Sequence, residues 1–328
     1  MKQRLFVTLS LAGLAVATFG ATKPKTAIKS LNKTTIQQPT YTEWHDLQVN
    51  AINRFPLHTN FFTYPADDWV YEKDGKIVSK DILHMNKAES KYFLSLDGTW
   101  KFNWVANADQ RPTDFYKEDL DDSKWKTMNL PGIWEMKGFG DPEYVNVGFG
   151  WRGHFDQQPP AVPTKDNHVG SYRRIIDIPA NWDGKQVVAH FGSVTSNIYL
   201  YVNGKFAGYA EDSKVAAEFD ITPYLKKGKN LIAFQTFRWC DGSWDEDQDF
   251  WRLSGVARES YLFARDAQLH LEDIRVTPDL VNNYKDGVLN ISAKVKGTGK
   301  LNFILFDKEG KQVTTATGLA KNGTAYIT

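Results

Sequence analysis

The alternation of apolar and polar positions predicts β-strands through the middle of the chain. In the segment 197–202, branched aliphatic side chains alternate with two tyrosines, as on a strand with two different faces. Asn203-Gly204 then supplies the left-handed residues that a two-residue hairpin needs. Comparable strand patterns fall at 92–104, 172–178, 186–191, 206–210, 230–239 and 256–265. Helical periodicity is scarce, so we predict a two-sheet sandwich of the jelly-roll type over residues 91–265.

A second, shorter set of strand patterns begins near Ala267. Apolar segments at 274–276, 288–295, 301–306 and 313–316 give about four strands. An immunoglobulin-like sandwich needs about seven strands and about 100 residues. We therefore expect an all-β protein in which a jelly-roll β-sandwich is followed by an incomplete immunoglobulin-like β-sandwich at 266–328. Such a module would leave an open strand edge, which suggests a truncated or split gene product.

The amino-terminal segment has the pattern of a secretory signal peptide, which we place at residues 1–17. Lys2 and Arg4 precede the apolar run Leu5–Val16, and Ala15-Val16-Ala17 fits a cleavage site. The run is too short to span a bilayer comfortably, no other stretch is apolar enough, and no cysteine follows it for lipid attachment. We expect an exported protein, periplasmic or extracellular, without a membrane span; an uncleaved anchor is the alternative.

Residues 18–90 are predicted to form a flexible linker and an extended arm. The stretch 18–40 is rich in Thr, Lys, Pro and Gln, and the aromatic residues of 41–90 show no period. Over the whole chain, 40 Lys and Arg balance 39 Asp and Glu, which argues against a nucleic-acid partner. Cys240 is the single cysteine, so an internal disulfide is excluded, and it is expected to be a small buried apolar residue.

Three segments interrupt the strand pattern and are candidates for function. They are the Gly- and Pro-rich loop 130–147, which carries Asn146, the segment 209–215, which carries Asp212, and the acidic segment 238–256. Asp245, Asp247 and Asp249 imitate the start of a calcium loop. However, Phe250 and Val256 stand where that loop needs Gly and Glu, so we reject a calcium site. Trp134, Trp151 and Trp239 are core candidates, although any tryptophan of a sandwich is also a candidate for stacking on sugar.

These segments together resemble the family 2 glycoside hydrolases and, within that family, the large bacterial β-galactosidases. The resemblance covers about residues 44–328. It rests on AINRFP at 51–56, SLDGTWKFNW at 95–104, YVNVGFGW at 144–151, GSYRR at 170–174, YAEDSKVAAEFDIT at 209–222 and RWCDGSWDEDQDFWRLSGVARE at 238–259. The last two motifs are highly specific when they occur together.

The resemblance implies a five-domain enzyme whose acid/base and nucleophile glutamates lie in a catalytic barrel. Retaining hydrolysis needs two carboxylates about 5 Å apart on a rigid scaffold. The residues after Arg265 are far too few for a barrel of roughly 250 residues. No residue here can be matched to those glutamates, so we assign no catalytic residue and expect the chain alone to be inactive.

Two residues match sugar-binding positions of the resembled family. Asn146 stands where the family has an Asn that hydrogen-bonds sugar hydroxyls, and an amide offers both a donor and an acceptor. Asp212 stands where the family has an Asp that ligates a monovalent cation and contacts the galactose 6-hydroxyl. The chain alone needs no cofactor, whereas sodium or potassium, and magnesium, are implied for a full-length relative. Glu211 is expected to be exposed and Glu218 to hold a turn.

The function predicted from the sequence is the amino-terminal sugar-binding portion of a retaining β-galactosidase that acts on terminal β-galactosides. One alternative is a stand-alone carbohydrate-binding module. Another is an assembly element that docks onto a separate chain carrying the barrel, or that forms a homo-oligomer. The expected small-molecule partner is a galactoside or a galactose-containing oligosaccharide. The natural glycoside stays open, since related sandwiches also precede glucuronidase and mannosidase barrels.

Overall fold

The computed structural model describes residues 4–10, 38–65, 68, 70–73, 76–79, 85–151, 155–246, 249–320 and 323–327. The chain divides into two compact units. The larger unit contains Gln37–Leu57 and Asn86–Arg265, and the smaller contains 266–328 with the described parts of 1–36 and 58–85. The helical segments that can be delimited are short 3-10 turns: Glu43–His45, Lys87–Glu89, Ala108–Gln110, Glu135–Lys137, Ala180–Trp182, Thr222–Tyr224 and Asp241–Trp244. The predicted all-β class is confirmed.

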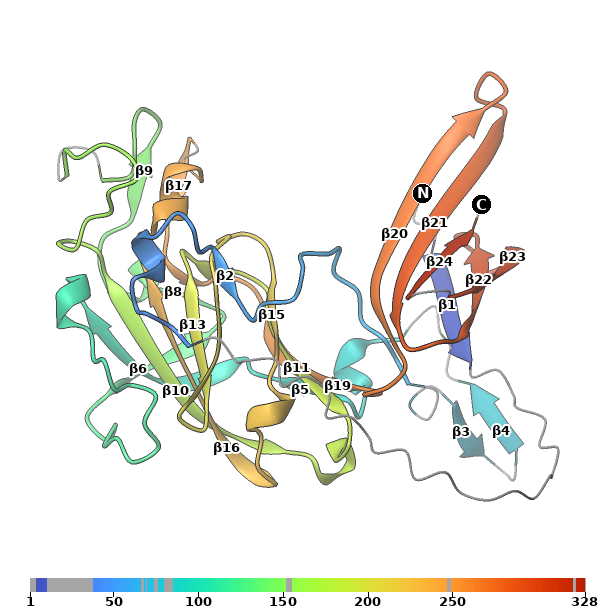
Figure 1. Ribbon diagram of the computed structural model, residues 1–328, viewed down its shortest axis with the longest axis horizontal. Coiled ribbons are helices and arrows are strands. Elements are labelled where there is room, and N and C mark those ends of the chain that lie inside the picture. The colour runs from blue at the N-terminus through green and yellow to red at the C-terminus, as the bar shows by residue number, and fades with distance from the viewer. Residues whose placement is uncertain are drawn as a thin grey trace, which may run out of the picture. The chain divides into compact units, whose positions relative to one another are not determined.

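The larger unit is built around two antiparallel sheets (Figure 1). Its strands are β2 (Ala51–Ile52), β5 (Phe93–Ser95), β6 (Gly98–Val105), β7 (Lys126–Leu130), β8 (Gly132–Ile133), β9 (Glu143–Val145), β10 (Val169–Ile178), β11 (Gln186–Phe191), β12 (Val194–Thr195), β13 (Ile198–Val202), β14 (Lys205–Ala210), β15 (Ala217–Asp220), β16 (Gly228–Phe237), β17 (Phe250–Arg252), β18 (Gly255–Val256) and β19 (Ser260–Arg265). One sheet has seven strands in the order β2-β14-β13-β16-β10-β6-β7, and the other has four in the order β15-β11-β19-β5. Two small sheets, β12-β18-β8 and β17-β9, are added to them. This is the predicted sandwich.

Strand β13 shows why the seven-stranded sheet is buried on both faces. Its aliphatic side chains, such as Leu200, belong to the main core cluster. Its tyrosines, Tyr199 and Tyr201, belong to a second cluster on the other face, which includes Trp44 of the amino-terminal arm. The Trp44 ring stacks on Phe237 with 5.0 Å between ring centroids. The arm therefore covers one face of the sheet, which explains why large aromatic residues, instead of small polar ones, alternate with the aliphatic ones.

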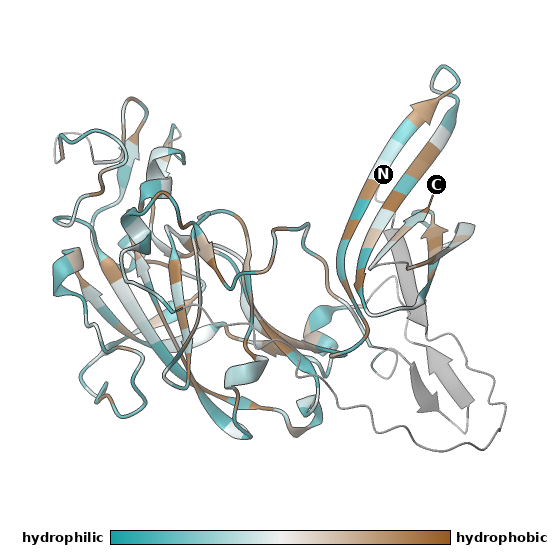
Figure 2. Cartoon of the chain, in the orientation of Figure 1, coloured by the Kyte–Doolittle hydropathy of each residue, from teal (hydrophilic) through white to brown (hydrophobic). Residues whose placement is uncertain are grey.

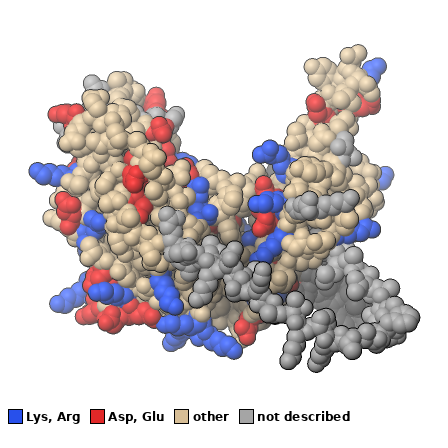
Figure 3. Space-filling model, viewed as in Figure 1, with Lys and Arg blue, Asp and Glu red and all other residues tan. Residues whose placement is uncertain are grey.

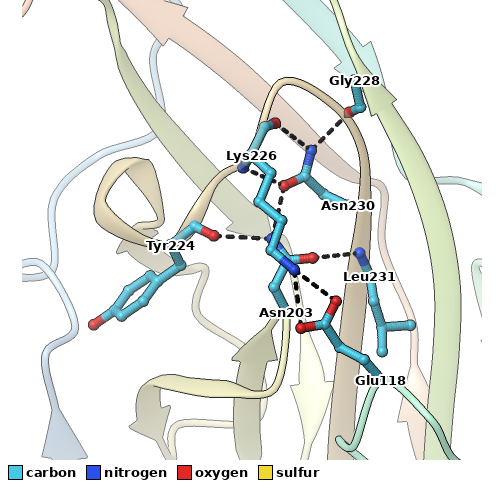
Figure 4. Close-up of polar contacts among 7 residues, drawn as sticks. All are labelled: Glu118, Asn203, Tyr224, Lys226, Gly228, Asn230 and Leu231. Atoms are coloured by element: carbon cyan, nitrogen blue, oxygen red, sulfur yellow. Dashed lines mark hydrogen bonds and ion pairs between the residues drawn. The ribbon is translucent and has the colours of Figure 1, made fainter.

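The hairpin between β13 and β14 turns at Asn203-Gly204, as predicted. Both residues have positive φ, 50° and 75°. The Asn203 side chain secures the turn, since its oxygen accepts the Leu231 N–H at 2.9 Å. Its amide nitrogen donates to the Tyr224 carbonyl at 2.9 Å and to the Asn230 side chain at 2.8 Å (Figure 4). A left-handed Asn thus joins the hairpin to the start of β16.

The smaller unit contains two three-stranded sheets, β20-β21-β24 and β1-β22-β23, and a two-stranded sheet, β3-β4. Its strands are β1 (Arg4–Ser10), β3 (Val70–Lys73), β4 (Lys76–Ser79), β20 (His270–Val281), β21 (Asp286–Lys296), β22 (Lys300–Phe306), β23 (Gln312–Leu319) and β24 (Thr324–Ile327). A small core cluster is formed by Ile291, Ala293, Val295, Leu301, Phe303, Ala320 and Ala325. β20 extends well beyond the predicted 274–276 because it pairs with β21 along its length. Both strands alternate between hydrophobic and hydrophilic residues (Figure 2).

Part of the predicted signal peptide lies among the described residues. The backbone of Arg4–Ser10 forms β1, which pairs antiparallel with β22. Residues 1–3 and 11–37, which include the rest of the predicted signal and most of the linker, lie outside the described residues. Cleavage and export therefore stay predictions. The described part of the chain contains no helix with the length and apolar character that crossing a bilayer requires.

Candidate functional site

Asp212 lies in the turn that follows β14, with its side chain directed to the surface. Its φ is 76°, in the left-handed region that Asp and Asn enter more readily than most residues. The carboxylate is 39 % exposed, and its Oδ2 accepts a hydrogen bond from Nη1 of Arg54 at 2.6 Å. Arg54 comes from the AINRFP motif of the arm. The arm therefore orients one oxygen of the predicted sugar-binding carboxylate.

The residues on either side of Asp212 are buried and bonded. The Glu211 N–H donates to the Asn50 carbonyl at 3.0 Å, and its carboxylate accepts the Tyr209 hydroxyl at 2.6 Å. The Ser213 N–H donates to the Glu246 carboxylate at 2.8 Å. The expectation that Glu211 is exposed was wrong, because the end of β14 carries it into the protein, where it is 7 % exposed.

Glu218 also differs from its expected place at a turn. It lies within β15, buried, and its carboxylate is 2.8 Å from Nδ1 of His190 on the neighbouring strand β11. A buried carboxylate needs a partner, and the cross-strand histidine provides one. Glu218 therefore joins two strands of the four-stranded sheet.

Burial dominates the electrostatics beneath Asp212. It raises the pKa of Glu211 to about 8, and the neighbouring Asp241 adds to this rise. The pKa of Asp241 is raised by burial as well, and that of the Cys240 thiol is raised by its complete burial. The ligand-type atoms of Glu211, Cys240 and Asp241 all lie within 4.8 Å of one another. A side-chain hydrogen bond joins the Glu211 and Asp241 carboxyls, and Cys240 is the buried apolar residue that the sequence predicted.

Asn146 lies immediately after β9, and its side chain is exposed. β9 pairs with β17, so that Val145 stands opposite Phe250. The ammonium group of Lys214, two residues beyond Asp212, lies 5.4 Å from the centre of the Phe250 ring. These contacts bring the Asn146 loop and the Asp212 turn to the same end of the sandwich. Within the described ranges, no hydrogen bond joins Asn146 to Asp212 directly.

The β9-β17 ribbon also carries three exposed aromatic rings, those of Tyr144, Phe250 and Trp251. Tyr144 and Trp251 stand opposite each other in the register, with 5.6 Å between ring centroids. They are 52 % and 50 % exposed, and the Tyr144 hydroxyl donates to Asp249. By contrast, Trp134, Trp151 and Trp239 are buried, as the sequence predicted. Tyr144 and Trp251 are therefore exposed aromatic residues of this region, and Phe250 is a third, against whose ring Lys214 lies.

Asp212 fits the predicted cation only in part. A carboxylate oxygen is a hard donor of the kind that such ions prefer. However, Arg54 already neutralises this carboxylate and engages Oδ2, so a sodium or potassium ion would use Oδ1 together with donors from elsewhere. Acidic and basic side chains are interspersed on the face of the protein that Figure 3 shows.

The larger unit is a two-sheet antiparallel sandwich, the architecture of jelly rolls such as those of lectin domains. Residues 93–266 match the model described as the sugar binding domain of glycosyl hydrolases family 2. The chain belongs to this family.

Its similarity to curated proteins extends beyond that domain. It is 37% identical over 284 residues to a β-galactosidase of Priestia megaterium, and the matched region covers 84% of this chain and 26% of the relative. It is 36% identical over 278 residues to a β-galactosidase large subunit of Lactobacillus helveticus, covering 80% and 41%. The chain thus spans about a quarter of the length of the first of these relatives and less than half of the second, and it corresponds to their amino-terminal part.

Solved structures support the fold. A calcium-binding mutant of Bacteroides uniformis β-glucuronidase 2 matches with a TM-score of 0.55 and 21% identity, covering 72% of this chain and 27% of that one. A Bifidobacterium dentium β-glucuronidase matches with a TM-score of 0.54 and 17% identity, covering 73% and 42%. At these identities the likeness concerns the architecture alone.

Proposed function

We propose that this chain is the galactose-recognition portion of a retaining β-galactosidase that acts on terminal β-galactosides. The observation that carries the proposal is the construction around Asp212. Its neighbours Glu211 and Ser213 are bonded in the interior, whereas its own carboxylate reaches the surface and is oriented by Arg54. The similarity to β-galactosidases of bacteria supports galactose as the sugar.

The two site residues offer complementary chemistry to a pyranose. The Asn146 amide both donates and accepts, and each oxygen of the Asp212 carboxylate accepts from a hydroxyl. Because Arg54 holds Oδ2, the carboxylate is already oriented before a ligand arrives, which lowers the entropy cost of binding. A sodium or potassium ion would bring further positive charge to Asp212 and to sugar oxygens.

Titration of the full 328-residue chain with galactose and lactose tests this proposal. We expect dissociation constants in the millimolar range and a loss of at least about tenfold in Asp212→Asn and in Asn146→Ala. Asp183→Asn is the matched control, because Asp183 is exposed and its ion pair with Lys227 lies on the surface. Equal affinity in Asp212→Asn and the control would overturn the assignment of Asp212.

Hydrolysis is expected to require residues that this chain does not supply. The purified 328 residues should leave a nitrophenyl β-galactoside intact, and turnover above the buffer rate would contradict this. In a longer protein with hydrolytic activity, Asp212→Asn should raise KM for a galactoside by about tenfold or more.

One observation favours a second function, a stand-alone carbohydrate-binding module. Tyr144 and Trp251 form an exposed aromatic pair, and such pairs are suited to stacking on sugar rings. If the aromatic pair is the main site, Trp251→Ala should abolish oligosaccharide binding while Asp212→Asn leaves it intact. The reverse result supports the galactosidase proposal.

Assembly and export complete the proposal. Because one relative is named a large subunit, we propose that this chain binds a separate partner chain. Co-purification with the protein encoded by the neighbouring reading frame would detect such a partner. We also propose export through the amino-terminal signal. Amino-terminal sequencing of secreted protein should then begin near residue 18.

A further inference from the structure

The segment that follows β16, residues 238–246, contacts both candidate loops. It begins at Arg238, the first residue beyond the strand, and includes the short turn Asp241–Trp244. β16 itself pairs with β10 on one side and with β13 on the other. The segment that begins where β16 ends is therefore attached to an inner strand of the seven-stranded sheet.

Arg238 is a buried cation that binds the loop carrying Asn146. It is 3 % exposed, and its Nη2 lies 3.0 Å from the Glu143 carboxylate. The same nitrogen donates to the Asp141 carbonyl at 3.4 Å. A hydrogen-bonded ion pair with a buried guanidinium is stronger than one in water, because it is screened less. Glu143 is the first residue of β9, and Asn146 directly follows the last residue of that strand.

His168 supports Arg238 from the other side. Its Nδ1 lies 3.3 Å from Nη1 of Arg238, and its Nε2 lies 3.0 Å from the Asp166 carboxylate. Burial, followed by the charge of Arg238, lowers the pKa of His168, so the neutral ring is favoured. These partners imply a tautomer in which Nε2 carries the proton and Nδ1 accepts from Arg238. Arg238 is thereby directed toward Glu143.

Trp239 holds the other end of the same loop. A Cβ placed on Gly150 would lie 2.5 Å from the Trp239 ring, so the backbone there rests directly against the indole. Trp151 packs edge-on against the same ring, with 5.3 Å between centroids. Arg238 and Trp239 thus secure the chain before and after Asn146.

The next residues of the segment support the Asp212 turn. Asp241 shares a hydrogen bond with Glu211, and Gly242 leaves room for the Glu211 carboxylate, since a Cβ there would meet its Oε2 at 2.8 Å. Glu246 accepts the Ser213 N–H. Both residues that flank Asp212 are bound by the same short segment.

We propose that Arg238 is a positioning residue of the sugar site, which sets the place of Asn146 through Glu143 and the Asp141 carbonyl while the following residues set the place of Asp212. The effect on sugar binding rests on the proposed function, whereas the effect on the loop does not. Arg238 touches no sugar in this scheme and acts only through the loop.

The test uses the full chain with Glu143→Gln, which removes the charge with little change of shape, and Arg238→Lys, which keeps the charge but loses the forked donor. Glu118→Gln is the matched control. Glu118 forms an exposed ion pair with Lys226 beside the Asn203 turn (Figure 4). This turn precedes β14, whereas Glu211 follows that strand. Hydrogen exchange of residues 141–150 and galactose affinity are measured for each.

We expect Glu143→Gln and Arg238→Lys to speed exchange in residues 141–150 by about tenfold, with β10 and β16 unchanged. Galactose affinity should fall several-fold. In an Asn146→Ala background, Glu143→Gln should have no further effect on affinity, because its influence passes through Asn146. The control should match the wild type in both measurements.

Two results would overturn the inference: unchanged exchange of 141–150 in both variants, or full additivity of Glu143→Gln and Asn146→Ala in affinity. A wild-type chain that binds no galactoside would instead refute the proposed function. In that case the exchange measurement alone decides the role of Arg238.

Discussion

The Asp212 turn and the Asn146 loop carry the two candidate sugar ligands and are held in different ways. Glu211 and Ser213, the immediate neighbours of Asp212, are buried and make the supporting hydrogen bonds themselves. Asn146 lies on an exposed stretch, and its support comes from Glu143 and Gly150, several residues away. The first side chain is positioned by local contacts and the second by the two ends of a longer loop.

This difference shows that two candidate sugar-binding side chains can be positioned with different consequences for the stability of the protein. The Asp212 turn needs buried carboxyl groups, which are stable only if their partners are complete. The Asn146 loop is held instead by the Arg238–Glu143 ion pair, the pairing of β9 with β17 and the close contact of Gly150 with Trp239. We expect substitutions beneath Asp212 to affect the whole fold, and substitutions around Asn146 to affect mainly the loop.

The largest effect is expected from Glu211→Ala. The change leaves the Tyr209 hydroxyl and Asp241 without their partner and opens a small cavity. The free energy of unfolding should fall by about 2–4 kcal/mol, measured by urea denaturation. A loss below about 1 kcal/mol would show that Glu211 is not structurally important, and the contrast between the two regions would disappear.

Gly150→Ala should have the next largest effect. Its new methyl group would meet the Trp239 ring at 2.5 Å, so either the indole or the loop must move. We expect a loss of about 1–3 kcal/mol in thermal unfolding, together with faster exchange in residues 141–150. Gly287→Ala is the control, because a Cβ there meets nothing within 4 Å. Equal behaviour of the two variants would refute the role of the Trp239 contact.

The pH dependence of stability should report the buried Glu211. Its pKa is raised to about 8 in the folded protein, so between pH 4.5 and 8 the folded state binds more protons than the unfolded state. Its contribution is therefore fully present below pH 4.5 and is lost as the pH rises toward 8, at up to about 1.4 kcal/mol per pH unit. Glu211→Gln should flatten this part of the curve, and identical wild-type and variant slopes would contradict the assignment.

The smallest effect on stability is expected from Asp212→Asn. The carboxylate is partly exposed, an amide oxygen in its place can still accept from Arg54, and Asn tolerates positive φ. The free energy of unfolding should change by less than about 1 kcal/mol while galactoside affinity falls. A large loss of stability would mean that Asp212 supports the turn, in which case reduced binding could not be assigned to a lost sugar contact.

Much of the sandwich could be predicted because its strands are long and regularly patterned. β13 and its Asn203-Gly204 turn were evident from alternation and turn chemistry alone. The two-residue strand β2 is too short for any pattern to show. The full length of β20 depends on pairing with β21 and not on its own sequence.

The candidate site was predictable in its motifs but not in its support. The polar stretch around Asp212 indicated an interruption of the strand pattern, and Glu211 within it was expected to be exposed. Its burial depends on partners at Asn50 and Asp241, which are distant in sequence. Arg54 could be suspected only from its place in a motif, and nothing local indicated that Arg238 reaches Glu143.

Because Arg238, Trp239 and Asp241 are nearly consecutive, one short segment contacts both candidate loops, in addition to Arg54 and Asn50 at the Asp212 turn and the pairing of β17 with β9. If either loop were replaced by that of a relative, its contacts with segment 238–246 would no longer match. An exchange that preserves these contacts would therefore include segments 138–151, 209–215 and 238–246 together.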